Sequence, residues 1–258
     1  ALDDQVAAGG QPHLAVERLQ DLLVDPVRGD VERPLFVAPG ISVTFDRTIE
    51  LARASTPLDR FVNITLRSAF GDTTVTSVAL QLPKGLTSDS ARRAATLAPG
   101  ATRTVTFRVR GTLPAGTHEI RAVAEAKGQQ FRTGYVPIEY EHIDPDRIYR
   151  PATLAINSID VLLPPRLSVA YIPGVGDNAA PMLQQLGVPL TILRPEEIPA
   201  TDLSRFSTVV VGPRAYEANK ALIDNNNHLL SYVPNGGHMV EAAQDVMADF
   251  MLLKADSS

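Results

Sequence analysis

The chain has 258 residues, with 24 Lys and Arg against 29 Asp and Glu and a formal net charge of −5. Its 44% hydrophobic and 21% charged residues are typical of a folded globular protein with one large domain or two ordinary ones. It has no cysteine, which excludes disulfides, thiolate metal sites and a cysteine nucleophile, and its slight excess of acid argues against nucleic-acid binding.

The N-terminal part predicts a helix and no targeting segment. Residues 1–4 lack the basic and apolar parts of a signal peptide. No apolar run of the chain approaches the roughly 18 residues that a membrane span needs. Residues 11–24 carry four leucines along one side of a helix. We therefore expect an N-terminal helical lead-in over residues 1–33.

Residues 34–140 predict an all-β domain. Short runs of β-branched and apolar residues alternate with polar ones, and turns rich in proline and glycine separate them. Such spacing is typical of an antiparallel, immunoglobulin-like β-sandwich. The runs are residues 41–45, 61–66, 75–82, 102–109, 118–124 and 131–138.

Residues 141–166 predict a linker. Asp144 precedes Pro145, and Pro164 precedes Pro165. Proline fixes φ and disfavours helix at the residue before it, so we expect extended chain with at most a short helix.

Residues 167–258 predict an α/β domain, because apolar strands alternate with helical patterns. The order is typical of a flavodoxin-like parallel sheet whose first and third strands are neighbours. The expected strands are residues 167–172, 188–193, 208–211 and 238–240, and the expected helices are residues 178–186 and 217–233.

Several stretches between residues 34 and 237 resemble one family. They are residues 142–145, 149–152, 169–177, 186–188, 202–206, 209–216, 230–233 and 236–237. In order and spacing they are similar to the region that follows the catalytic domain of large bacterial PIG-L/LmbE-family deacetylases. The resemblance covers about four-fifths of the chain. It implies a NEW3-type β-sandwich followed by a class I glutamine amidotransferase/ThuA-like α/β domain.

The chain departs from this family where the chemistry would lie. The family's zinc motif of His-Pro-Asp-Asp type is absent, and the five histidines are scattered singly. Amidotransferases need a cysteine nucleophile, and the chain has none. We therefore expect no catalytic residue, metal or cofactor in this chain. After Gly237 the family continues with an apolar strand, whereas residues 241–245 read as a polar helix, so the second domain is expected to be truncated.

The first candidate loop follows the first strand of the α/β domain. It contains Gly174, Gly176 and Asp177 and opens a helix, so its amides could hold an anion. It lacks the third glycine of a dinucleotide-binding loop and the lysine of a phosphate-binding loop. The alternative is a glycine turn in which Asp177 or Asn178 caps the helix.

The second candidate loop follows the third strand and places Arg214, Tyr216 and Glu217 beside the first loop. Arg214 could pair with the carboxylate of a ligand or with Asp177, and Tyr216 could stack on a sugar ring. A structural salt bridge of Arg214 is the alternative. If the two loops adjoin, they form a crevice between them. The backbone amides of the first loop and the guanidinium of Arg214 then predict positive potential in that crevice.

Two functions remain open. The first is a non-catalytic accessory region that serves a deacetylase of N-acetylated sugars, with an upstream deacetylase domain and a carbohydrate or glycoconjugate as partners. The second is a small-anion or carbohydrate-binding, or weakly enzymatic, α/β domain with a pocket at the loops after Ile172 and Val211. The resemblance implies a bacterial periplasmic or extracellular location, and the composition leaves a cytoplasmic one open.

Overall fold

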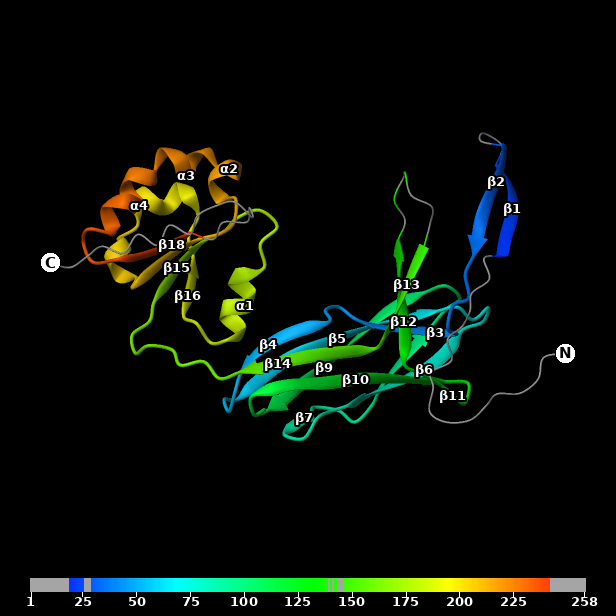
Figure 1. The fold of residues 1–258 in the computed structure, drawn as a ribbon. Coiled ribbons are helices and arrows are strands. Elements are labelled where there is room, and N and C mark those ends of the chain that lie inside the picture. Colours follow the sequence, from blue (N-terminus) through cyan, green and yellow to red (C-terminus); the bar gives the residue numbers. More distant parts are fainter. Residues whose placement is uncertain (1–18, 26–28, 139, 141, 143–145, 242–258) are drawn as a thin grey trace.

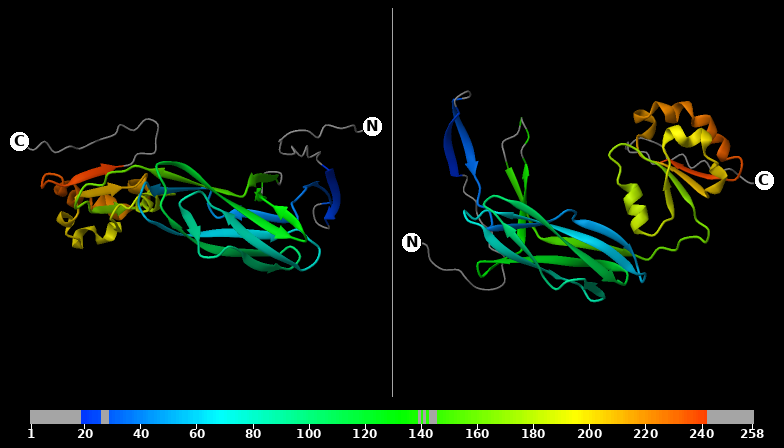
Figure 2. Two further views of the ribbon diagram at one scale, coloured as in Figure 1. Left: turned by 90° about the horizontal axis from the view of Figure 1, so that it is seen from below. Right: turned by 180° about the vertical axis from the view of Figure 1, so that it is seen from behind.

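The computed structural model describes residues 19–25, 29–138, 140, 142 and 146–241. These residues form several β-sheets and a few short helices, so this part of the chain is mostly β (Figure 1). A unit of two sheets lies in the middle, a smaller unit with helices lies at one end, and hairpins rise from the other end (Figures 1 and 2). None of the helices described is long and apolar enough to cross a membrane.

The first unit has two sheets packed face to face, an arrangement compatible with a β-sandwich. One sheet has the order β3-β5-β9-β7, made of β3 (Ile41–Phe45), β5 (Leu58–Ser68), β9 (Thr102–Gly111) and β7 (Leu86–Ser88). The other has the order β4-β14-β10-β6-β8, with β11 paired on β10; the bounds are β4 (Ile49–Arg53), β14 (Thr153–Ile159), β10 (Gly116–Ala126), β6 (Thr74–Gln81), β8 (Arg93–Leu97) and β11 (Gln129–Phe131).

Alternation of side chains builds the core between these sheets. Ile64 and Phe107 of one sheet and Val78 and Ala124 of the other are fully buried in one hydrophobic cluster. Their strand neighbours face outward, because successive residues of a strand point to opposite sides. The six strands expected between residues 41 and 138 are confirmed. One pairing differs from the antiparallel prediction, since β4 and β14 run parallel.

Two further expectations for this part of the chain need correction. Leu19–Asp25 forms β1 and pairs with β2 (Gly29–Leu35), so residues 19–24 are strand and not helix; residues 11–18 lie outside the described residues. A short apolar run suits either structure, and pairing with β2 decides for the strand. β14 lies in a sheet between β4 and β10, so residues 153–159 belong to the first unit and not to a linker.

The expected extended conformation before the second unit is observed. Residues 146–166 contain β14 and β13 (Asp146–Pro151), and no helix is assigned there. β13 pairs with β12 (Thr133–Ile138) in a two-stranded hairpin that stands away from the sandwich (Figure 1).

The second unit has a four-stranded, fully parallel sheet. Its order is β16-β15-β17-β18, made of β15 (Val169–Ile172), β16 (Leu190–Ile192), β17 (Thr208–Val211) and β18 (His238–Glu241). The strands are those expected, with β17 at the predicted bounds. α1 (Ala179–Gln185) and the short 3₁₀ helices Pro195–Ala200 and Leu203–Arg205 connect them. Glu241, where a polar helix over residues 241–245 was expected to begin, is the last residue of β18, and residues 242–245 lie outside the described residues.

The single helix expected over residues 217–233 is three short ones. They are α2 (Ala215–Ala218), α3 (Lys220–Asp224) and α4 (Asn226–Tyr232). Asn219 interrupts the run because it takes an extended conformation and its Oδ1 accepts from the amide of Ala221 at 2.9 Å. Asparagine competes with helical hydrogen bonds in this way, which the apolar pattern alone does not reveal.

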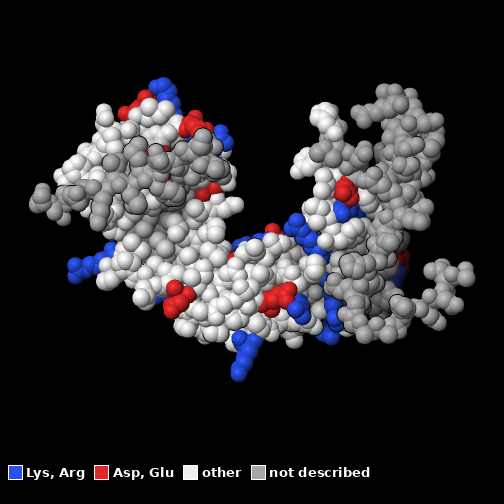
Figure 3. All heavy atoms as spheres, viewed as in Figure 1, with Lys and Arg blue, Asp and Glu red and all other residues white. Residues whose placement is uncertain are grey.

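The two units touch where α1 meets β4. Oε1 of Gln185 accepts from the amide of Leu51 at 2.7 Å, and Arg60 donates to the Gln185 carbonyl at 3.2 Å. β4 is an edge strand, so Gln185 satisfies an amide that the sheet leaves open. Figure 3 shows a broad hollow between the second unit and the hairpin end of the molecule.

Candidate functional site

The two candidate loops leave neighbouring strands at the same sheet edge. β15 and β17 pair in parallel, with Ile172 opposite Val211. The amide of Gly212 donates to the carbonyl of Ile172 at 2.8 Å, so the strands stay joined up to the loops. The predicted neighbourhood of the first and third strands is confirmed.

The loops then close directly on each other. The amide of Val175 donates to the carbonyl of Pro213 at 3.0 Å. A Cβ on Gly174 would lie 2.0 Å from the Pro213 oxygen, and one on Gly212 would lie 2.5 Å from Oδ2 of Asp177. The two loops are therefore in direct contact beside Gly174 and Gly212.

Asp177 ties this contact together. Its Oδ2 accepts from the hydroxyl of buried Tyr171 and from the Gly174 amide at 3.2 Å, and its Oδ1 accepts from the Ala179 amide at 2.7 Å. The last bond caps the start of α1, as the glycine-turn alternative predicts. The carboxylate thus holds the loop to the strand and to the helix.

Hydrogen bonding sets the charge state of this pair. Burial alone would raise the pKa of Asp177, but the bonds from Tyr171, Ala179 and Gly174 hold that pKa below its ordinary value of 3.8. Burial and the neighbouring carboxylate raise the pKa of Tyr171 far above its ordinary value. At neutral pH Asp177 is ionised and Tyr171 is neutral. Their pKa values lie far from 7, so neither group is suited to act as a general acid or base near pH 7.

Arg214 and Glu217 form an exposed pair at the second loop. Nε of Arg214 lies 2.8 Å from Oε2 of Glu217, and the side chains are 55% and 63% exposed. This is the salt bridge that the sequence offered as the alternative, with Glu217 as the acid. The positive potential expected in the crevice stays a prediction.

Tyr216 has a packing role. Its ring lies against the core of the second unit, and its hydroxyl donates to Oδ1 of Asn226 at 2.8 Å. Burial, with the charge of Glu241, raises its pKa. A ring packed on the core offers little surface for stacking on a sugar.

The structure does not bring the side chains of all six candidate residues together. Gly174 and Asp177 are brought together, while Arg214 pairs with Glu217 and Tyr216 joins the core. Gly176, with φ of +63°, has open space where a Cβ would lie. Among the described residues, no group of three or more His, Asp or Glu side chains is placed to hold a metal ion. Ligand binding by these residues stays a prediction.

Sequence reasoning missed the central role of Tyr171. A tyrosine inside an otherwise aliphatic buried strand was the available signal, because a buried hydroxyl needs a hydrogen-bond partner. It also missed two surface grooves away from the crevice. One, of about 630 Å³, lies along β16 and residues 196–206; the other, of about 460 Å³, lies between β8 and β9.

Comparisons with known proteins do not assign a family. No model of a protein family matches the chain, and no curated protein matches its sequence. Solved structures share parts of it at low similarity. The native α-2-macroglobulin of E. coli is 17% identical, over 50% of this chain and 7% of that one, with a TM-score of 0.33. A FixG-related protein from Vibrio parahaemolyticus is 11% identical, over 46% of this chain and 94% of that one, with a TM-score of 0.29. At these TM-scores the likeness carries no argument about function.

Proposed function

We propose that this chain is a non-catalytic accessory region that serves a PIG-L/LmbE-like deacetylase of N-acetylated sugars. In this proposal the first unit is an immunoglobulin-like, NEW3-type sandwich, and the second is a flavodoxin-like fold derived from an amidotransferase-like ancestor. The partners are an upstream deacetylase domain and a carbohydrate or glycoconjugate.

The arrangement around Asp177 carries the proposal. It lies at the strand-to-helix turn where open α/β folds place ligands and reactive groups. There the carboxylate accepts three hydrogen bonds from its own chain, and the opposite loop packs on the glycine beside it. A turn used in this way stabilises the fold, which suits a domain that retains the architecture of an enzyme while serving another.

Two measurements test the accessory role. The reading frame upstream of Ala1 is expected to encode a zinc deacetylase domain. That domain should release acetate from N-acetylglucosamine oligomers with a lower KM, at unchanged kcat, when this chain is present. A reading frame without such a domain, or acetate release by this chain alone, would contradict the proposal.

A second candidate is an anion site at the crevice, and the 55% exposure of Arg214 favours it. Arg214→Ala should then weaken phosphate binding measured by calorimetry. Arg194→Ala is the matched control, because Arg194 is also exposed and also pairs with a glutamate three residues later. Equal heats in both variants and in the unaltered chain would leave the crevice without a ligand.

A further inference from the structure

The sandwich is open along one edge, between β7, β8 and β9. β7 pairs with β9 only at Val109–Gly111, whereas β9 begins at Thr102. After Asp89 the chain leaves β9 and crosses to the other sheet, where it forms the edge strand β8. Among the residues that the structure describes, the part of β9 before Arg108 therefore has a sheet partner on only one side, β5.

The backbone of that segment offers hydrogen bonds in a known direction. The carbonyl of Arg108 accepts from the Asp89 amide at 3.0 Å, and the Arg108 amide donates to Oδ1 of Asp89 at 3.1 Å, so both groups face the β7 side. Because strand ladders alternate every second residue, the amides and carbonyls of Thr106 and Thr104 face the same open side. A further strand could pair there in line with β7.

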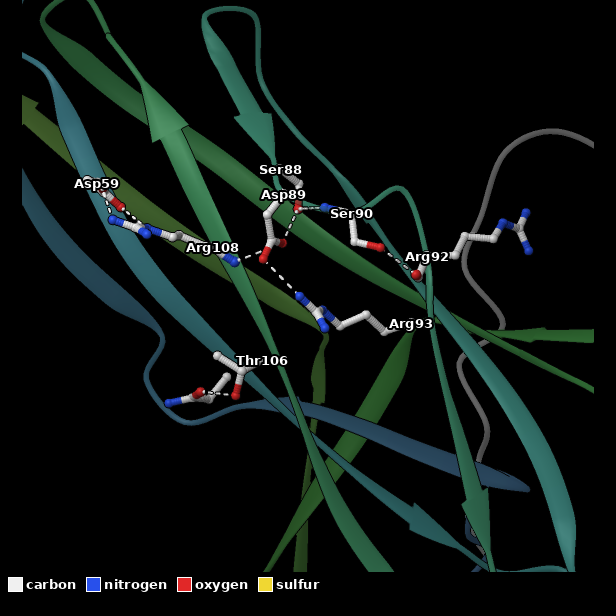
Figure 4. A network of polar contacts seen from close by, with 9 residues as sticks. Asp59, Ser88, Asp89, Ser90, Arg92, Arg93, Thr106 and Arg108 are labelled. Atoms are coloured by element: carbon white, nitrogen blue, oxygen red, sulfur yellow. Dashed lines mark hydrogen bonds and ion pairs between the residues drawn. The ribbon is translucent and has the colours of Figure 1, made fainter.

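A groove lies at this opening. It has a volume of about 460 Å³ and is lined by Ser90, Arg92, Arg93, Ala94 and residues 104–106. Its two arginines pair with acids that do not line it: Arg93 with Asp89 and Arg92 with Glu125, each at 2.8 Å. Figure 4 shows Arg93 reaching toward Asp89 and Arg92 extending away from that network.

The charge around the groove is opposite to that of the whole chain. The four arginines at positions 92, 93, 108 and 110 pair with the three carboxylates of Asp59, Asp89 and Glu125, a local excess of one positive charge in a chain of net charge −5. In addition, Nε of Arg93 is buried without a hydrogen-bond partner in the described structure. That atom is enclosed by protein, and the guanidinium carbon lies 5.4 Å from the centroid of the Phe107 ring, so an occupant of the groove would not reach Nε.

We propose that this groove binds an extended peptide segment that carries acidic side chains. Its backbone adds as a strand beside Thr104 and Thr106 of β9, continuing the row begun by β7, and its carboxylates lie against Arg92 and Arg93. Main-chain pairing supplies affinity, and the arginines select for acidic sequence. This site is independent of the proposed accessory function.

The probe is a fluorescent ten-residue peptide that alternates valine with glutamate, and the matched control peptide replaces each glutamate with lysine. Anisotropy with the full chain should show binding of the acidic peptide only. Arg92→Ala, which alters a 61% exposed side chain, should weaken binding at least fivefold. Arg121→Ala, whose side chain is 62% exposed and pairs with Glu119, should leave it within twofold.

Hydrogen exchange distinguishes strand addition from simple charge attraction. Bound peptide should slow the amides of Thr104 and Thr106 at least tenfold. Equal binding of both peptides, unaltered binding in Arg92→Ala, or no protection of these amides would overturn the proposal. The proposal would also be overturned if these amides became protected without peptide as the protein concentration rises. That result would assign the edge to a second copy of the chain. Competition by a sulfated oligosaccharide without amide protection would assign the groove to a glycan instead.

Discussion

Gly174 lies where two loop backbones meet, and the space for a side chain is already filled. The Pro213 oxygen stands 2.0 Å from the place of its Cβ, and both loops are held by the strands behind them. A side chain at this position would fit only if one of the loop backbones moved, and such a movement costs far more than turning a neighbouring side chain. This makes the residue a sensitive probe of the contact between the candidate loops.

We expect Gly174→Ala to lower the free energy of unfolding of the second unit by about 1–3 kcal/mol, as overpacking of a filled site does. Gly71→Ala is the control, because no atom lies within 4 Å of its Cβ position and its φ is not positive. That change should stay within about 1 kcal/mol. Urea unfolding measures both. Equal effects would show that the loops are not in contact.

Tyr171→Phe removes one donor from the ionised carboxylate of Asp177. We expect a loss of about 1.5–3 kcal/mol in the free energy of unfolding at pH 7, the usual value of a hydrogen bond to a charged group. The folded pKa of Asp177 is lowered, so this contribution is present above its ordinary value of 3.8 and disappears as the pH falls through the folded pKa.

Tyr216→Phe is the control for that pH dependence. Its hydroxyl donates to the uncharged Oδ1 of Asn226, so the cost of the change should not vary between pH 7 and pH 2. Urea unfolding at both pH values compares the two variants. A Tyr171→Phe cost that stays constant down to pH 2 would contradict the assigned bond to Asp177.

At the scale of elements, α1 serves as the cover of an open strand edge. Gln185 at its end accepts from the Leu51 amide of β4, at a position where the sheet itself offers no neighbour. Exposed strand edges invite pairing with other chains, and covering them is one of the ways by which proteins avoid it. One helix of the second unit thus protects a strand of the first.

Gln185→Ala should therefore speed hydrogen exchange of the Leu51 amide by about two- to tenfold, which corresponds to one ordinary hydrogen bond. Gln184→Ala is the matched control, since Gln184 is the same residue type in the same helix and is exposed. It should leave that amide unchanged. If both variants behave alike, the two units do not dock through Gln185.

At the scale of the molecule, the hydrophobic cores are separate. Leu222 is buried in a cluster made only of residues from the second unit, and Phe107 is buried in a cluster made only of residues from the first. The polar contacts described between the units are those of Gln185 with Leu51 and Arg60. Cores of this kind can melt on their own.

We expect two calorimetric transitions. Leu222→Ala should lower the midpoint of one, and Phe107→Ala that of the other, because removing a large buried side chain costs about 2–5 kcal/mol. The chain without either change gives the reference curve. If either variant shifts both transitions equally, the chain unfolds as one cooperative unit and the predicted division into domains is wrong.

Strong hydrophobic patterns in the sequence predicted the elements that carry them. Period-two alternation located β3, β5, β6, β9, β10 and β12, and continuous apolar runs located β15 and β17, because these patterns follow from which faces of a strand are buried. Strands with weaker patterns are not predicted. The sequence predicts a linker where β14 lies and a helix over residues 19–24, because the structure of such segments depends on the partners that they meet in the folded chain.

At the candidate site, the sequence determined which loops would be neighbours, because parallel strands that pair must end at one edge. How the two loops contact each other follows from the folded structure. The partners of Asp177 are a tyrosine six residues earlier and two nearby amides, and the space beside Gly174 is taken by Pro213 from a distant segment. Side-chain direction and close approach between segments depend on packing of the whole unit, which residue order alone does not encode in a readable form.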